Sequence, residues 1–220
     1  MRVYYIIILL CINLLSCHEK EIEFDACESS HNTKSLYCLV LKNNSNLNYA
    51  FYNTFFGDNN NWGYNADAKI YIQDQNGKSP EANNIYIDER IPNSIEMKKF
   101  LENEKKDSIL WKDLLKKDAK VSYEWFKKYK SLIKSRIILF PNKKYNFSKN
   151  IFFFKNQLQS SGTYYSFDKN KKYFIQIELT FDSIKIKDRL TINDLDSLKK
   201  NKIKIFHGKL KTEKTPLIIE

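Results

Sequence analysis

The most reactive side chains of this 220-residue sequence are four cysteines and three histidines. A thiol can form a disulfide, a thioether or a metal bond, and an imidazole can serve as a base or a metal ligand. A structural zinc site needs about four such ligands close together, and only His31 lies near a pair of cysteines. We therefore expect no metal site and no cofactor. These residues are Cys11, Cys17, Cys27, Cys38, His18, His31 and His207.

Catalytic signatures are sparse, so we expect that the protein is not an enzyme. The sequence has no HExxH or GxSxG motif and no glycine-rich phosphate loop. A Ser-His-Asp hydrolase would have to use His207, which we interpret as a strand residue. A carbohydrate-active hydrolase with dispersed acids stays open as an alternative, because such pairs are assembled in space. The acids nearest to predicted strands are Asp88, Glu89, Glu178 and Asp182.

One loop begins like a calcium site. Residues 58–63 place Asp at loop position 1, Asn at position 3 and Gly at position 6. Position 5 is Trp62 and position 12 is Lys69, and neither side chain offers a ligand oxygen. The segment is therefore interpreted as a turn.

Residues 1–17, MRVYYIIILLCINLLSC, have the layout of an export signal. Arg2 is followed by an apolar run from Val3 to Leu15 that only Asn13 interrupts. A membrane span takes about 20 apolar residues and a signal-peptide core about 7–15, so the run fits the second. Its end, Leu14-Leu15-Ser16-Cys17, resembles the lipobox of bacterial lipoprotein precursors. The alternative is an ordinary secretory signal with an incidental cysteine.

The lipobox resemblance implies cleavage of a signal peptide at residues 1–16 and lipidation of Cys17. Each buried CH₂ contributes about 0.8 kcal/mol to membrane binding, so two or three acyl chains would anchor the chain firmly. The residue after Cys17 is His18, and not the aspartate that tends to retain lipoproteins at the inner membrane of enteric bacteria. The charged run 18–21 is loosely similar to the export signals of Bacteroidota surface lipoproteins, and the alternative is a solvated tether. We expect a bacterial cell-envelope protein anchored in the outer membrane.

Cys27 and Cys38 would remain in the mature chain. In an oxidising compartment such a pair favours a disulfide, which would contribute about 2–3 kcal/mol by closing a short loop. The alternative is two buried free thiols.

Charge is distributed unevenly along the chain, whose formal net charge is +11. Residues 17–95 hold 6 basic and 11 acidic side chains, residues 96–149 hold 16 and 7, and residues 150–220 hold 14 and 8. A basic half could face anionic lipid or an acidic partner, and it could also be a solvated surface. No nucleic-acid-binding motif is present, so a nucleic-acid partner is not expected.

The elements that would position these residues are mostly strands. After a polar tether at 17–35, runs of β-forming residues alternate with turn clusters over 36–92 and 136–220. The clearest run is 173–181, where apolar residues alternate with polar ones. The opening strand, Asn-rich turn and aromatic strand of 36–56, together with the closing runs 202–210 and 215–220, are similar to immunoglobulin-like and fibronectin-III-like modules. The predicted fold is a mainly β, antiparallel sandwich, as in Bacteroidota lipoproteins with an immunoglobulin-like domain.

A helical segment is predicted at about 93–135, inserted into the β framework. Asn93 and Asp107 could each cap a helix, and apolar residues recur every four positions from Val121 to Ile133. The insertion either covers an open end of the sheets or offers a partner-binding or membrane-facing surface. The residues proposed for partner binding are Leu110, Leu114, Trp125 and Tyr129.

A second candidate surface is the aromatic, amide-rich stretch 49–65. Aromatic faces beside amide groups suit a glycan or peptide ligand. Trp62 and Tyr64 lie in its loop, where exposure would permit ligand binding.

The function expected is a lipid-anchored binding module for an envelope protein or glycan. An immunity or inhibitor protein acting through the basic insertion is the alternative, beside the hydrolase.

Overall fold

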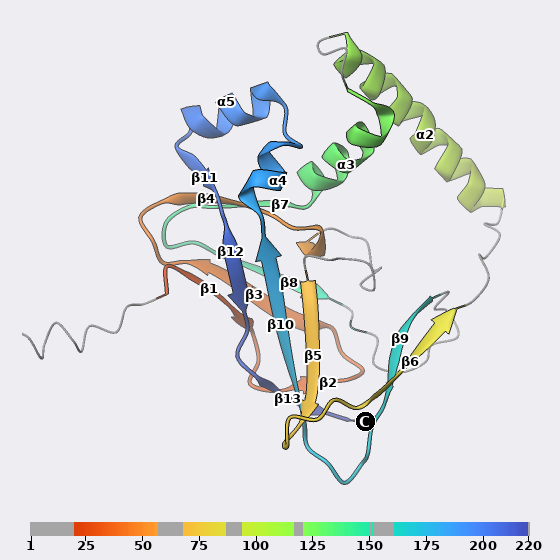
Figure 1. Cartoon of the computed structure of the whole chain (residues 1–220), viewed down its shortest axis with the longest axis vertical. Helices are drawn as coiled ribbons and strands as arrows, with labels where there is room; N and C mark the ends of the chain where they lie inside the picture. The colour runs from red at the N-terminus through yellow and green to blue at the C-terminus, as the bar shows by residue number, and fades with distance from the viewer. Residues whose placement is uncertain are drawn as a thin grey trace, which may run out of the picture.

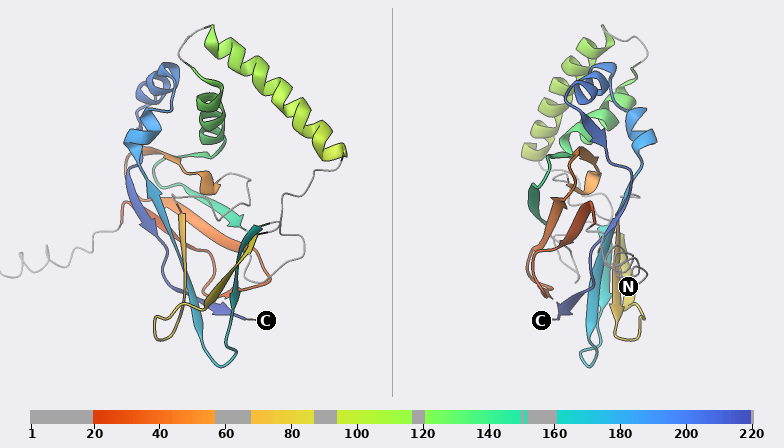
Figure 2. Two further views of the ribbon diagram at one scale, coloured as in Figure 1. Left: turned by 45° about the vertical axis from the view of Figure 1, so that its right-hand side comes forward. Right: turned by 90° about the vertical axis from the view of Figure 1, so that its left-hand side faces the viewer.

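The computed structural model describes residues 20–56, 68–86, 94–116, 121–149, 151 and 161–219. In these ranges the chain is a mixed α/β fold with four small sheets, and its helices gather at one end of the sheets (Figure 1, Figure 2). Among the described residues, no helix combines the length and the apolar character that crossing a membrane requires.

The first sheet is antiparallel, with strand order β1-β3-β8. Its strands are β1 (Ile22–Ala26), β3 (Tyr37–Asn43) and β8 (Lys144–Lys149). The second sheet is built on β10, which pairs with β5 along one edge and with β12 and β13 along the other, while β2 joins β13 in parallel. Its strands are β2 (His31–Asn32), β5 (Ala68–Asp74), β10 (Tyr173–Phe181), β12 (Gly208–Lys211) and β13 (Thr215–Ile218).

Two smaller sheets complete the β structure. The third has the order β11-β4-β7, in which β11 and β4 are parallel. The fourth is the antiparallel pair β6–β9. Their strands are β4 (Asn48–Tyr52), β7 (Arg136–Leu139), β11 (Ile203–Ile205), β6 (Glu81–Tyr86) and β9 (Ser161–Ser166), and a short 3₁₀ turn, η1 (Thr54–Phe56), follows β4.

The alternation predicted for 173–181 is confirmed in β10. Its five odd-numbered residues, Tyr173 to Phe181, are all buried, and they pack with the apolar faces of β1 and β3 in the main core. Aromatic rings fill one end of this core, where the centroids of Phe51 and Phe206 lie 4.9 Å apart and those of Phe181 and Phe206 lie 5.2 Å apart. Burial of such large rings is the dominant favourable contribution to folding.

Strand β4 separates this main core from a second, smaller one. Phe51 faces the main core, whereas its neighbours Ala50 and Tyr52 pack with helix residues such as Leu132 and Leu198 in the second core. Successive side chains of a strand point to opposite faces, so one strand can serve both cores. The helices are α2 (Ser94–Leu115), α3 (Tyr123–Lys134), α4 (Ser183–Lys187) and α5 (Ile192–Lys200).

The predicted immunoglobulin-like sandwich is wrong. The strands divide among four sheets, two of which contain a parallel pair, and no sandwich of paired antiparallel sheets is formed. The first departure is at Asn43, where the chain leaves the first sheet for the third instead of turning back as a hairpin. The fully buried Asn43 amide stabilises this corner by donating to the carbonyls of Leu47 and Leu139, at 2.7 and 3.1 Å.

The closing strands also differ from the prediction. The run 202–210 is split into β11 and β12, which belong to different sheets. Strands β12 and β13 do not pair with each other but share one edge of β10, separated by the buried Thr212, whose backbone and hydroxyl bond Ile177. The helical segment predicted at 93–135 is present as α2 and α3. Asp107 lies inside α2 and does not begin a helix.

Candidate functional site

The sequence-predicted site residues fall into three groups in the structure. Cys17, Trp62 and Tyr64 lie outside the described residues, as does the loop 58–63. Cys27 and Cys38 form the disulfide that the sequence favoured. The four helical residues proposed for partner binding are all described, and they lie in α2 and α3.

The disulfide belongs to the folded domain, and so does most of the segment assigned to a tether. Residues 22–26 form β1 and residues 31–32 form β2, so the folded chain begins soon after Lys20. The backbone amide of Cys27 also donates to the carbonyl of Cys38, at 3.1 Å. Much of the segment predicted to be a polar tether, 17–35, is therefore part of the folded chain.

The four proposed partner-binding residues do not form one stripe. Leu110 is 53% exposed and Leu114 is partly buried, one turn apart on α2. Trp125 and Tyr129 stack on each other along α3, with ring centroids 5.1 Å apart. Tyr129 also packs against the second core, and burial, with a smaller effect of Asp194, raises its pKa to about 12. Tyr129 therefore helps to hold α3 against the second core.

Helices α2 and α3 form a pair that we call the helical arm. Glu104 of α2 accepts a hydrogen bond from the Tyr123 hydroxyl at 2.9 Å and lies 3.1 Å from the Lys127 ammonium. The hydrogen bond from Lys127 and then that from Tyr123 lower the pKa of Glu104. The Trp111 indole donates to the carbonyl of Val121 at 2.9 Å. These are mainly polar contacts, and all of them lie in the half of α2 after residue 103.

A further ion pair joins the two helices at Asp107 and Lys130, whose side chains are 13% and 28% exposed. The Trp111 ring meets the edge of Tyr123 at 5.3 Å, and the Lys127 ammonium lies 4.8 Å from the Tyr123 centroid. The contact between α2 and α3 therefore combines one small aromatic contact with several charge-assisted ones.

The first half of α2 presents a different surface. Met97, Phe100 and Leu101 are 40%, 55% and 58% exposed. A shallow hollow runs along this half of the helix and extends to Lys105, with lysines beside the apolar side chains. It is lined by Ser94, Met97, Lys98, Leu101, Glu102 and Lys105. Exposed large apolar side chains gathered on one helix commonly mark an interaction surface, and we take this hollow as the candidate site.

Among the described residues, the arrangement most like a catalytic one is at His207. Its Nδ1 lies 3.3 Å from the Ser183 hydroxyl, and Asp182 is adjacent. The same Nδ1 accepts the backbone N–H of Ser183 at 3.2 Å, so its lone pair is already used. Asp182 caps α4 through the amides of Ile184 and Lys185. This cluster is a helix cap, and His207 lies between β11 and β12, not in a strand as predicted.

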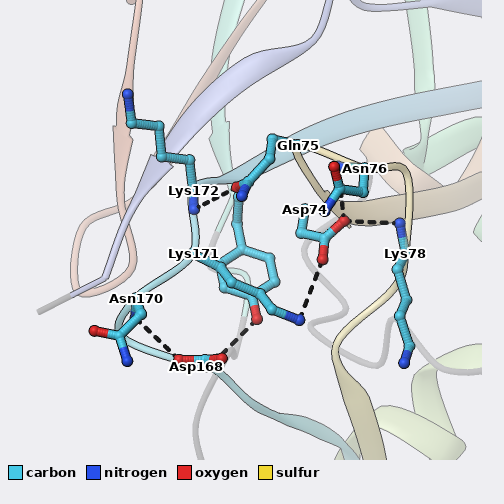
Figure 3. Close-up of polar contacts among 9 residues, drawn as sticks. Asp74, Gln75, Asn76, Lys78, Asp168, Asn170, Lys171 and Lys172 are labelled. Atoms are coloured by element: carbon cyan, nitrogen blue, oxygen red, sulfur yellow. Dashed lines mark hydrogen bonds and ion pairs between the residues drawn. The ribbon is translucent and has the colours of Figure 1, made fainter.

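Another acid with several partners is Asp74, at the end of β5 (Figure 3). Its carboxylate accepts the amides of Asn76 and Lys78, each at 2.9 Å, and lies 3.4 Å from the Lys171 ammonium. The amide of Lys78, more than any other contact, lowers the pKa of Asp74. The adjacent turns are joined where Lys172 donates its amide to Gln75 at 2.9 Å. These contacts hold together the turn that follows β5 and the turn that precedes β10, so Asp74 has a structural role. The described residues contain no group of three or more His, Cys, Asp or Glu that could hold a metal.

Comparison with known proteins gives no match: no protein family, no curated protein and no solved structure is similar to this chain. The site therefore has to be judged on its own residues. The partner-binding residues predicted from the sequence lie in the second half of the helical segment, and none of them lies in the exposed first half of α2. The spacing of Met97, Phe100 and Leu101 (i, i+3, i+4) was the available signal, because it places them on neighbouring positions of one helix.

Proposed function

We propose that this protein is a lipid-anchored protein of the bacterial cell envelope that binds a protein partner through the first half of α2, without catalysing a reaction. Two features support the anchor. The lipobox-like end of residues 14–17 supplies the lipidated cysteine, and the first strand, β1, begins five residues later at Ile22. The single observation that carries the binding role is the exposed apolar surface of Met97, Phe100 and Leu101.

The charges beside this surface indicate the chemistry of the partner. Lys98, Lys99, Lys105 and Lys106 are exposed and form no ion pair with another described residue. Glu104, one of the acids of α2, is engaged by α3. A partner that offers apolar side chains flanked by carboxylates would complement such a surface, through burial of the apolar groups and attraction of the charges.

The position of the arm in the fold suits this role. Figure 1 and the left view of Figure 2 place α2 on the far side of the molecule from the start of β1, which leads to Cys17. An anchor at Cys17 would therefore leave the hollow on α2 accessible to a partner in the envelope.

Site-specific photo-crosslinking in cells tests the proposal. A photoreactive residue in place of Leu101 should give one discrete crosslinked envelope protein, and the same residue in place of the exposed Ile218 should not. Lys98→Glu with Lys105→Glu should abolish that crosslink, since the charges would then repel an acidic partner. A lack of any crosslink at position 101, or a crosslink that survives both charge reversals, would overturn the proposal.

A further inference from the structure

We infer that the edge of the fold where β1 begins is a docking surface for anionic lipid headgroups. The inference rests on the proposed lipid anchor at Cys17, and it assigns an orientation to the anchored protein. It concerns a surface on the opposite side of the molecule from the hollow on α2.

The chain is fixed to the fold almost as soon as it leaves the anchor. Asn44 donates its backbone amide to the carbonyl of Glu21 at 2.8 Å and its side-chain amide to the carbonyl of Lys20 at 3.2 Å. Ile22 then pairs with Asn43 in the first sheet. Three residues separate Cys17 from Lys20, and a fully extended chain covers at most about 3.6 Å per residue. Lys20 therefore stays within about 11 Å of Cys17.

Three turns meet at this edge, which we call the tether edge: residues 43–47, 140–143 and 199–202. The first two are joined because Asn43 donates its amide to the carbonyl of Lys143 at 3.0 Å and accepts the amide of Asn142 at 2.8 Å. The third joins them where the Asn48 side chain donates to the carbonyl of Asn201 at 3.4 Å. Figure 1 shows these turns on the side of the molecule where β1 begins.

The tether edge combines one exposed aromatic ring with many lysines. Phe140 is 52% exposed at the start of its turn. Two acids lie at this edge: Glu23 is paired with Lys42 at 3.4 Å, and the exposed Glu21 accepts a hydrogen bond from the Tyr49 hydroxyl at 3.5 Å. The lysines are exposed and form no ion pair with another described residue. They are Lys143, Lys199, Lys200 and Lys202.

A surface of this composition suits a membrane. A lysine near an anionic leaflet contributes about 1 kcal/mol, an effect that decays over a Debye length of about 8 Å at physiological salt. The short connection keeps Lys20 within about 11 Å of Cys17, so the tether edge faces the membrane in which Cys17 would be anchored. An acyl chain and a polybasic patch together bind a membrane far more firmly than one chain does. The lysines thus act with the anchor and hold the arm away from the bilayer.

Vesicle sedimentation tests the lysines separately from the anchor. The mature chain carrying Cys17→Ser is mixed with phosphatidylcholine vesicles that do or do not contain phosphatidylglycerol. We expect binding only to the anionic vesicles, and about 100-fold weaker partitioning for Lys143→Gln, Lys199→Gln and Lys200→Gln combined, since each lysine contributes a factor of about five.

The matched control removes the same charge from α2, as Lys98→Gln, Lys105→Gln and Lys106→Gln, and should leave partitioning unchanged. Equal losses from the two triple variants, or no binding to anionic vesicles, would overturn the docking surface. Either result would leave the lipid anchor itself untouched, because this chain carries no lipid.

Labelling of the lipidated protein tests the orientation. A fluorophore on Lys200→Cys should be quenched by nitroxide lipids in anionic vesicles, and one on Lys106→Cys should not. Equal quenching at both positions, or stronger quenching at position 106, would contradict the assigned orientation. An intact mass of the same preparation shows whether the acyl chains are present, so a missing anchor is distinguished from a wrong orientation.

Discussion

The main core and the helical arm are stabilised by different forces. In the main core, Phe51, Phe181 and Phe206 are packed ring against ring between β-strands. In the arm, Glu104 and Asp107 of α2 contact α3 through ion pairs and a hydrogen bond. Apolar burial is insensitive to moderate salt and pH, whereas exposed charge pairs are sensitive to both. Helix α3 is held on β4 by apolar packing in the second core, whereas α2 is held on α3 mainly by polar contacts.

The largest effect is expected in the main core. Phe51→Ala removes a fully buried ring and should lower the free energy of unfolding by about 3–5 kcal/mol, because both transfer and cavity costs apply. Urea unfolding measures the change. Phe140→Ala, at an exposed position, is the control and should cost less than about 0.5 kcal/mol. Similar costs at the two positions would contradict the assignment of the main core.

The disulfide should have the next largest effect. Replacing Cys27 and Cys38 by serine releases a bridge between residues 11 positions apart and should cost about 3 kcal/mol in the chain-entropy model. Thermal unfolding of the variant and of the reduced wild type should agree. If reductant left the melting temperature of the wild type unchanged, the bridge would not contribute to stability.

Removing a charge at the contact between α2 and α3 should destabilise the helical arm without unfolding the sheets. Glu104→Gln removes the ion pair with Lys127, so amide exchange should accelerate in α2 while exchange in β10 stays slow. Because the folded-state pKa of Glu104 is lowered, its contribution is complete above the unfolded pKa of about 4.3 and is lost as pH falls through the folded value. Exchange in α2 should therefore also rise with acid in the wild type. Equal acceleration in α2 and β10 would show that the two regions unfold together.

The smallest effect on stability is expected on the exposed half of α2. Leu101→Ser changes an exposed side chain and should alter the free energy of unfolding by less than about 0.5 kcal/mol. The same change should weaken the crosslink proposed for this surface. A large loss of stability would mean that Leu101 is part of the protein's own packing.

Local patterns predicted several elements correctly. The alternation of 173–181 identified β10 and its buried face, and the helical segment was also placed correctly. Both predictions follow from neighbouring residues in the sequence, where the period carries the information. The Cys27–Cys38 bridge was favoured on another ground, the expected export to an oxidising compartment.

The sheet topology could not be predicted in the same way. An Asn-rich turn after β3 is compatible with a hairpin, but the Asn43 amide donates to the carbonyl of the distant Leu139 as well as to that of the nearby Leu47, and β4 joins another sheet. The pairing of β11 with β4 joins residues far apart in sequence, which no local pattern encodes. The exposure of Met97 and Leu101 likewise depends on how far α3 extends along α2.

The most direct test of the account is the intact mass of protein extracted from membranes, for the wild type and for Cys17→Ser. We expect a wild-type mass equal to that of residues 17–220 plus acyl chains, and no such species for the variant. An unmodified wild-type mass that begins at another residue would contradict the lipid anchor, and with it the orientation inferred from the tether edge.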